Sequence, residues 1–195
     1  MSRVRVCIPG LPVLLSLALI LPAFAQKPQP QASPNPVVLL ETTMGAIKVE
    51  LFQSKAPITV KNYLDYVSMG FYNGTIVHRI DFVIGMGGYT ENLMGRPTLA
   101  AIKNESKNGL KNIRGTLAMA RYDNPDSATS QFFINLKNNA HLDPSGAEVG
   151  YAVFGKVIEG MDVVDKIAAV KTGNKGPFSN IPLQNIVVKS ATVAK

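Results

Sequence analysis

A short segment of the chain combines an aromatic ring and amide groups on one face of a predicted strand. In SQFFINL, residues 130–136, a strand period of two directs Phe133 to the same face as Gln131 and Asn135. The apolar residues between them point the other way, toward a core. A ring beside an amide favours a surface on which an apolar ligand packs, unless a neighbouring loop covers Phe133. The residues alone leave both alternatives open.

A second segment, TIVHRI at residues 75–80, places a permanent charge in a strand of core-type residues. The same alternation puts Arg79 on the face of Val77. An arginine in this position is either a solvated charge at a sheet edge or a donor aimed at a ligand. Taken alone, the segment favours the solvated charge.

Several common kinds of catalytic site are excluded by the residue inventory. The only histidines are His78 and His141, and Cys7 is the only cysteine, so zinc ligands are lacking, and no calcium-loop pattern occurs. The run Gly85–Gly88 fails as a dinucleotide loop because Thr90 stands where the last glycine is needed. No G-x-S-x-G motif surrounds any serine. We therefore expect chemistry that needs no cofactor, metal or covalent nucleophile.

Short strand-like runs with few helices predict a mainly β fold around these residues. Two β-type runs flank Thr43–Gly45, which is a hairpin signal. Apolar residues at helical spacing predict a helix over residues 56–70, with Pro57 in its first turn, and a second short helix fits residues 161–170. Further strands are expected at residues 75–80, 116–120, 132–136, 151–157 and 186–193. Many strands with two helices favour a closed antiparallel barrel or a sandwich over a parallel fold.

The first 25 residues have the layout of a secretory signal peptide. Arg3 and Arg5 precede an uncharged stretch that ends in Ala23-Phe24-Ala25, an A-x-A cleavage site. The stretch is interrupted by prolines, which argues against an uncleaved anchor, so no stable membrane insertion is expected after cleavage. Cleavage would leave a chain without cysteine, suited to an oxidising compartment.

The mature chain is expected to consist of a linker and one domain. Residues 26–36, QKPQPQASPNP, predict an extended Pro/Gln-rich linker, and the folded domain is expected over residues 37–195. Removal of residues 1–25 lowers the formal net charge from +7 to +5. The lysines and arginines are scattered singly, which favours a soluble basic surface over nucleic-acid binding. Nothing in the sequence indicates an oligomer, and we expect a monomer.

Four consecutive blocks of the sequence resemble bacterial cyclophilins, and periplasmic ones in particular. They are NYLDYVSMGFYNGTIVHRI, IKNESKNGLKNIRGTLAMAR, DSATSQFFINL and GYAVFGKVIEGMDVVDKI. The resemblance implies a closed eight-stranded antiparallel β-barrel capped by two α-helices, with an active groove on its outer wall. It also implies peptidyl-prolyl cis-trans isomerase activity without cofactor or metal, acting on proline-containing unfolded or partly folded polypeptides. We expect folding assistance to exported proteins in the periplasm, with secretion as the second choice, and at most weak binding of cyclosporin-like ligands.

The resemblance assigns roles residue by residue. Arg79 matches the family's catalytic arginine, and Gln131 matches a residue that hydrogen-bonds the substrate backbone. The proline pocket is expected to have Phe82 and Phe133 as walls and an apolar lining that includes Met119 and Leu142. The remaining groove positions are Ala120, Arg121 in place of a common asparagine, His141 in place of a Trp or Phe, and Tyr151 in place of a histidine found in some relatives.

The chain departs from the family pattern beside the catalytic arginine. The usual sequence is H-R-[IV]-I-P-G-F-M-I-Q-G-G-G-F-T, whereas this chain has HRIDFVIGMGGYT. Two residues are missing before Phe82, and Gly85 stands where a glutamine of the groove is expected. Two hypotheses follow. Arg79, Phe133 and Gln131 favour a working isomerase with reduced or redirected activity, whereas Gly85 and the shortened turn favour a proline-binding chaperone or interaction module with weak or no turnover.

Overall fold

The computed structural model describes Met1 and residues 35–194. The remainder of the predicted signal peptide, with Cys7, and residues 26–34 of the predicted linker lie outside the described residues. The first strand begins at Val37, directly after Pro36, whose carbonyl accepts a hydrogen bond from the Leu51 amide at 2.8 Å. No helix among residues 35–194 combines the length and the apolar character needed to cross a membrane.

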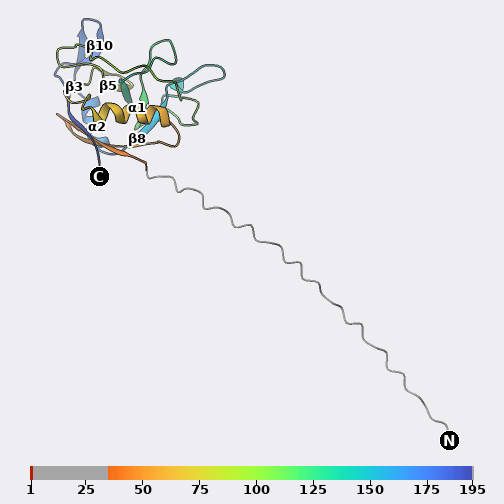
Figure 1. Ribbon diagram of the computed structural model, residues 1–195. Helices are drawn as coiled ribbons and strands as arrows, with labels where there is room; N and C mark the ends of the chain where they lie inside the picture. Colours follow the sequence, from red (N-terminus) through yellow and green to blue (C-terminus); the bar gives the residue numbers. More distant parts are fainter. Residues whose placement is uncertain (2–34, 195) are drawn as a thin grey trace. The chain divides into compact units, whose positions relative to one another are not determined.

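Within residues 35–194, nine strands form one strongly curled antiparallel sheet, a half-barrel (Figure 1). Their order is β3-β11-β1-β2-β8-β6-β7-β5-β4, and every neighbouring pair is antiparallel. The strands are β1 Val37–Thr42, β2 Gly45–Leu51, β3 Thr75–Ile76, β4 Arg79–Ile80, β5 Val83–Met86, β6 Thr116–Met119, β7 Phe132–Asn135, β8 Val153–Glu159 and β11 Val187–Val193. A separate hairpin consists of β9, Thr172–Lys175, and β10, Phe178–Pro182.

The first two strands form the predicted hairpin. The Thr42 hydroxyl accepts a hydrogen bond from the Met44 amide at 3.0 Å and donates one to the Gly45 carbonyl at 2.7 Å. Gly45 has a φ of 135°, a conformation that side chains rarely adopt, and this explains the glycine at the end of the turn. The hairpin prediction is confirmed.

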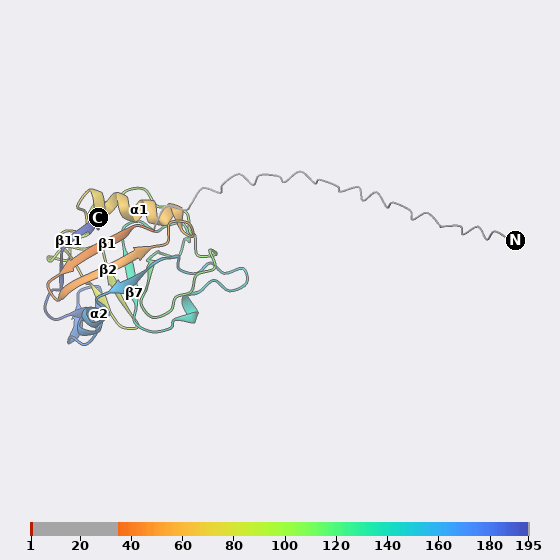
Figure 2. The ribbon, with the colours of Figure 1, turned by 90° about the horizontal axis from the view of Figure 1, so that it is seen from below.

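In the part of the chain that the structure describes, two α-helices cover the curled sheet, on opposite sides of the strands in Figure 2. They are α1, Pro57–Ser68, and α2, Met161–Ala168, and both predicted helices are confirmed within two residues. Ala56 offers no side-chain cap to α1. Instead, the Glu105 carboxylate accepts the amides of Ile58 and Thr59 at 3.1 and 2.8 Å. A distant acidic side chain therefore satisfies the positive end of α1.

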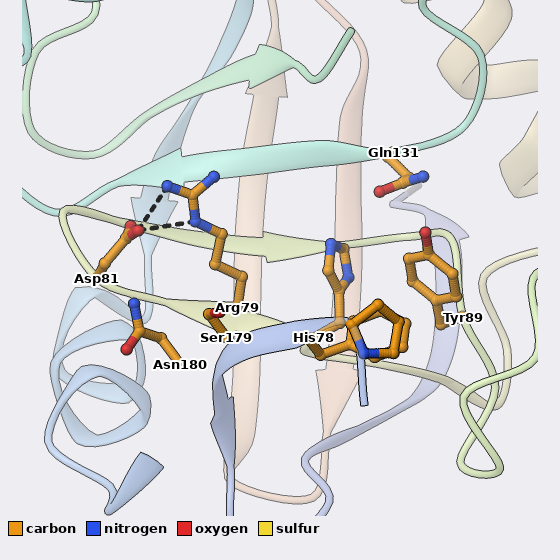
Figure 3. A pocket seen from close by; sticks show the side chains of 9 residues that line it. His78, Arg79, Asp81, Tyr89, Gln131, Ser179 and Asn180 are labelled. Carbon is orange, nitrogen blue, oxygen red and sulfur yellow. Dashed lines mark hydrogen bonds and ion pairs between the residues drawn. The ribbon is translucent and has the colours of Figure 1, made fainter. Parts of the chain in front are cut away.

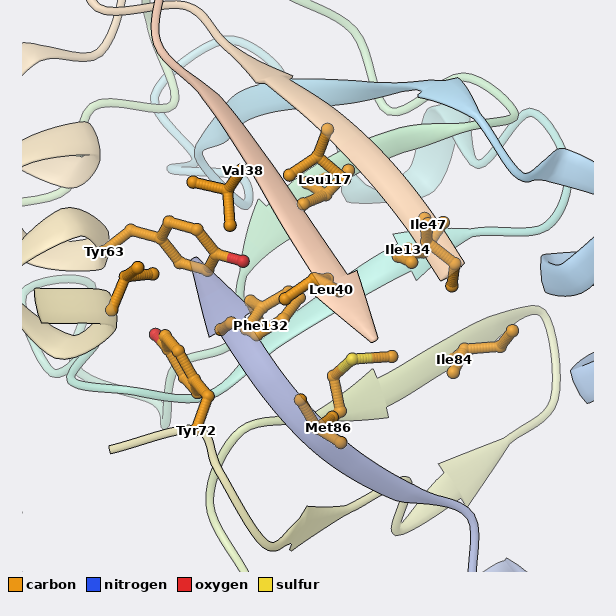
Figure 4. Close-up of a cluster of buried hydrophobic side chains, with 14 of the residues drawn as sticks. Val38, Leu40, Ile47, Tyr63, Tyr72, Ile84, Met86, Leu117, Phe132 and Ile134 are labelled. Carbon is orange, nitrogen blue, oxygen red and sulfur yellow. The ribbon is translucent and has the colours of Figure 1, made fainter. Parts of the chain in front are cut away.

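The main core fills the inside of the curl, where α1 packs on the strands (Figure 4). Tyr63 of α1 is fully buried and meets the Phe132 ring edge-on, with the ring centroids 5.1 Å apart. Phe132 and Ile134 lie in this core, as the alternation in residues 130–136 predicts. Phe133, which lies between them in the strand, therefore points to the outer face.

The structure differs from the expected fold in four places. Strand β5, Val83–Met86, is not among the predicted strands. The sheet has nine strands and open edges at β3 and β4, so a closed eight-stranded barrel is not confirmed. Residues 75–80 form two short strands because the Ile76 amide bonds to Tyr89 and the His78 amide to Gly85, on different segments. The β9–β10 hairpin lacks the apolar alternation of a half-buried strand, and no strand is predicted there.

Candidate active site

Strand register places one row of residues across the outer face of the sheet. Arg79 of β4 lies opposite Gly85 of β5, and Gly85 lies opposite Phe133 of β7. The row continues to Ala118 of β6 and Val153 of β8. Directly opposed residues of neighbouring strands share a face, so a charged side chain, a bare glycine and an apolar patch lie in line.

The apolar end of this row is a cluster outside the main core. Its buried members are Val83, Ala118, Phe133, Leu142 and Val153, and the partly buried side chains packed against them are Phe52, Phe82, Leu110, Ala120 and Tyr151. The Phe133 ring is only 6% exposed, and its centroid lies 5.7 Å from that of Tyr151. Neighbouring groups therefore cover Phe133, although Phe82 beside it remains partly accessible.

The charged end of the row is Arg79, whose side chain is about half exposed. Its guanidinium carbon lies 5.4 Å from the centre of the Phe82 ring, within range of a cation–π contact. The Asp81 carboxylate accepts hydrogen bonds from Nε at 2.7 Å and pairs with Nη2 at 2.6 Å (Figure 3). A donor with a permanent charge is thus held at the edge of an apolar cluster.

A cavity of about 380 Å³ borders Arg79 on the side of the β9–β10 hairpin. Its lining residues are His78, Arg79, Asp81, Tyr89, Gln131, Pro177, Phe178, Ser179 and Asn180. Burial, together with the Arg79 charge, lowers the pKa of His78 to about 4. His78 is therefore neutral at neutral pH and adds no second charge to the groove.

Gly85 is buried and lies between Arg79 and Phe133 in the row, without a side chain of its own. A Cβ atom at this position would lie 3.4 Å from the Arg79 Cβ and 3.4 Å from Nε2 of His78. A side chain at residue 85 would consequently begin beside the side chains of Arg79 and His78. This is the place where the family pattern expects a glutamine.

A second, smaller hollow lies beyond Gln131. It has a volume of about 90 Å³ and includes Ala120, Arg121, Tyr89 and Gln131 in its lining. The Arg121 guanidinium donates to the Val149 carbonyl at 2.7 Å and lies 4.8 Å from the centre of the Tyr151 ring. Arg121 thus holds the chain before Tyr151 in place.

Most of the residues that the sequence singles out come together here. Phe82, Phe133, Leu142, Ala120 and Tyr151 share the outer apolar cluster, and Arg79, Gln131 and Arg121 border it or the two hollows. His141 is exposed and packs edge-on against Phe82, with the ring centroids 5.1 Å apart.

Met119 is the exception, because the structure places it in the main core. It is 2% exposed and pairs with Phe132, the inward-facing ring of β7. Alternation along β6 turns Ala118 outward and Met119 inward, so Met119 does not line the outer cluster. Sequence reasoning missed Val83 and Ala118. Their pairing with Asn135 and Phe133 of β7 places them in the outer cluster, and no local pattern specifies that pairing. Among residues 35–194, no three potential metal-ligating side chains form a group.

Comparison of the sequence with known proteins gives matches to one protein family. The family model described as cyclophilin type peptidyl-prolyl cis-trans isomerase/CLD matches residues 37–193. The chain is 49% identical over 184 residues to peptidyl-prolyl cis-trans isomerase A of Dickeya dadantii, covering 93% of this chain and 94% of the relative. It is 53% identical over 168 residues to a peptidyl-prolyl cis-trans isomerase of Acinetobacter baylyi, covering 83% and 89%.

Solved structures agree with the sequence comparison. The crystal structure of a cyclophilin type peptidyl-prolyl cis-trans isomerase of Cryptosporidium parvum matches with a TM-score of 0.69 at 28% identity, covering 83% of this chain and 98% of that one. A crystal structure of the same protein in the presence of the dipeptide Ala-Pro matches with a TM-score of 0.68 at 29% identity, covering 82% and 99%.

The curled sheet with two helices, the outer groove and these matches define the class: the chain belongs to the cyclophilin family. It is a peptidyl-prolyl cis-trans isomerase, an enzyme that accelerates rotation about X-Pro peptide bonds. Enzymes of this family bind proline-containing peptides.

Proposed function

We propose that Arg79 is the catalytic residue and that the outer apolar cluster receives the substrate proline. The observation that carries this proposal is the strand register, which aligns Arg79 with Phe133 across Gly85 on one face of the sheet. Phe82 and Leu142 complete the apolar side, and Gln131 supplies an amide for the substrate backbone.

The proposed mechanism follows from the electronic structure of the X-Pro bond. Rotation faces a barrier of about 18–20 kcal/mol because the nitrogen lone pair is conjugated with the carbonyl group. A hydrogen bond from the Arg79 guanidinium to the prolyl nitrogen holds the lone pair on nitrogen and weakens that conjugation. The apolar rings beside Arg79 exclude water and so strengthen the interaction as the carbonyl rotates. No bond is made or broken, so the mechanism requires no nucleophile.

The loss of the groove glutamine at Gly85 bears on the rate, and we propose that turnover persists despite it. Two-dimensional exchange NMR on an Ala-Pro peptide reports binding and isomerisation in one sample. Accelerated cis–trans exchange at substoichiometric protein supports the enzyme. Peptide binding without accelerated exchange would instead support the proline-binding chaperone or interaction module. Weak binding of cyclosporin-like ligands is part of the same proposal, since His141 replaces a larger ring beside Phe82.

We further propose that the enzyme is exported and assists the folding of exported proteins as a monomer. Arg3, Arg5, the uncharged stretch and the A-x-A site support cleavage after Ala25, and the periplasm is the proposed compartment. Amino-terminal sequencing of the chain from a periplasmic fraction should give Gln26 as the first residue. A full-length chain in the cytoplasmic fraction would contradict export, and a cleaved chain in the medium would indicate secretion.

The sheet closure that the family resemblance implies belongs to this proposal as well. We infer that the two edges of the sheet close into a barrel through the chain segments beside the groove. The Ile76 amide of β3 donates to the Tyr89 carbonyl at 2.9 Å, and Thr75 bridges to Thr90, both just beyond the end of β5. Slow amide exchange at Ile76 would support this closure, and fast exchange would count against it.

A further inference from the structure

The shortened turn between β4 and β5 brings a carboxylate to the catalytic arginine. Asp81 is the first residue of the turn, two positions after Arg79, and its side chain is 19% exposed. One carboxylate oxygen, Oδ1, accepts the Val83 amide at 3.1 Å. The other, Oδ2, accepts Nε of Arg79 at 2.7 Å and lies 2.6 Å from Nη2. The two oxygens thus serve two different partners.

We propose that Asp81 is a positioning residue that aims the Arg79 guanidinium at the substrate. This inference rests on the proposed catalytic role of Arg79. Among residues 35–194, Asp81 is the only side chain that accepts a hydrogen bond from Arg79 or forms an ion pair with it. The Oδ1 contact anchors the carboxylate to the turn, and the Oδ2 contacts fix the Nε edge of the guanidinium.

Fixing one edge of the guanidinium leaves the opposite edge to the substrate. An arginine has five N–H donors in a planar fork, so the two groups held by Asp81 leave Nη1 to donate into the groove. Figure 3 shows the guanidinium turned toward Asp81. With Gly85 in place of the family's glutamine, residue 85 supplies no side chain that could hold the guanidinium. Among residues 35–194, Asp81 is therefore the side chain that holds the Nε edge of the guanidinium.

The carboxylate also opposes the positive charge that the mechanism uses, so the two effects must be weighed. The Arg79 side chain is 49% exposed, and water screens the attraction between exposed charges strongly. A long side chain without a fixed partner, in contrast, distributes itself over many rotamers, few of which reach the prolyl nitrogen. We expect the gain in rate from a fixed orientation of Arg79 to exceed the loss in rate from the opposing charge of Asp81.

The test is the Asp81→Asn variant, which keeps the turn and removes the anchor. The asparagine oxygen can still accept the Val83 amide, but its NH₂ group cannot accept from a guanidinium. We expect kcat on an Ala-Pro peptide to fall roughly 3- to 10-fold, with KM changed less than about twofold and an unaltered urea unfolding midpoint. Asp81→Glu, which retains the charge, should recover part of the loss. The control is Asp165→Asn, because Asp165 binds Arg114 at 2.7 and 2.8 Å away from the groove.

A double-mutant cycle separates positioning from a purely structural role. In an Arg79→Ala background, Asp81→Asn should cause no further loss, because the group that it positions is absent. An equal loss in both backgrounds would show that Asp81 acts on the fold alone. Unchanged or increased kcat in Asp81→Asn would overturn the inference, since the carboxylate would then have no effect on the rate or would lower it. Full activity of Arg79→Ala by itself would refute the proposed site, a different result.

Discussion

Replacement of Gly85 by glutamine should increase the isomerase activity. A glutamine at residue 85 would begin between Arg79 and Phe133 on the outer face of the sheet, since Gly85 lies opposite both in register. Its Cβ would have 3.4 Å contacts to Arg79 and His78, which demand only shifts of a few tenths of an ångström. Gly85 does not have a positive φ, so a side chain adds no backbone strain. We therefore expect Gly85→Gln to fold normally.

The expected gain follows from one added hydrogen bond in the transition state. A net contribution of about 0.5–1.5 kcal/mol corresponds to a roughly 2- to 12-fold increase in kcat/KM. Initial rates on an Ala-Pro peptide measure it, and Gly85→Ala is the matched control, because it adds the Cβ atom without the amide. A folded Gly85→Gln enzyme no faster than Gly85→Ala would refute the reasoning that the missing amide limits turnover.

Three further predictions concern stability and groove geometry. The pKa of His78 is about 4 in the folded chain and 6.5 in the unfolded chain, so the imidazole of the unfolded chain is protonated first as the pH falls. The unfolding free energy should therefore fall by about 3 kcal/mol between pH 6.5 and pH 4. In urea titrations, the His78→Gln variant should lack this pH-dependent loss of stability. Glu105→Ala removes the hydrogen-bond acceptor at the start of α1 and should lower the unfolding free energy by about 1–2 kcal/mol. The control Glu159→Ala removes an exposed ion pair and should change the unfolding free energy by less than about 0.5 kcal/mol. Equal losses in the two variants would contradict the capping role of Glu105. Gly88→Ala would bring a Cβ to 2.5 Å from Cγ of Gln131, so it should displace that amide and lower kcat/KM roughly 2- to 12-fold, and an unchanged rate would argue against the role of Gln131.

Local patterns predicted some of the elements around the groove, although not β5 or the β9–β10 hairpin. The two-residue period placed Phe133 and Phe132 on opposite faces, and this is observed, because burial of one face fixes the register of a strand. Helical spacing and Pro57 located α1 in the same way. These features depend on near neighbours in the chain, so the sequence alone could reveal them.

Features that depend on distant segments escaped prediction. The inward position of Met119 follows from its pairing with Phe132, which no local pattern of residues 116–120 specifies. The β9–β10 hairpin becomes a wall of the cavity through contacts with β4, although its sequence is largely polar. The pair of Asp81 with Arg79 required the actual geometry of the shortened turn. The open, nine-stranded order of the sheet likewise follows from long-range pairing.

The most direct test of the central claim is the isomerisation rate of an Ala-Pro peptide with the chain from Gln26 and its Arg79→Ala variant. Arg114→Ala is the matched control, since Arg114 also pairs with an aspartate but lies outside the groove. Arg79 is half exposed, so its removal should leave the fold intact. We predict that acceleration by the parent chain falls at least about 100-fold in Arg79→Ala and persists in Arg114→Ala. Equal acceleration by the parent chain and a folded Arg79→Ala variant would contradict it.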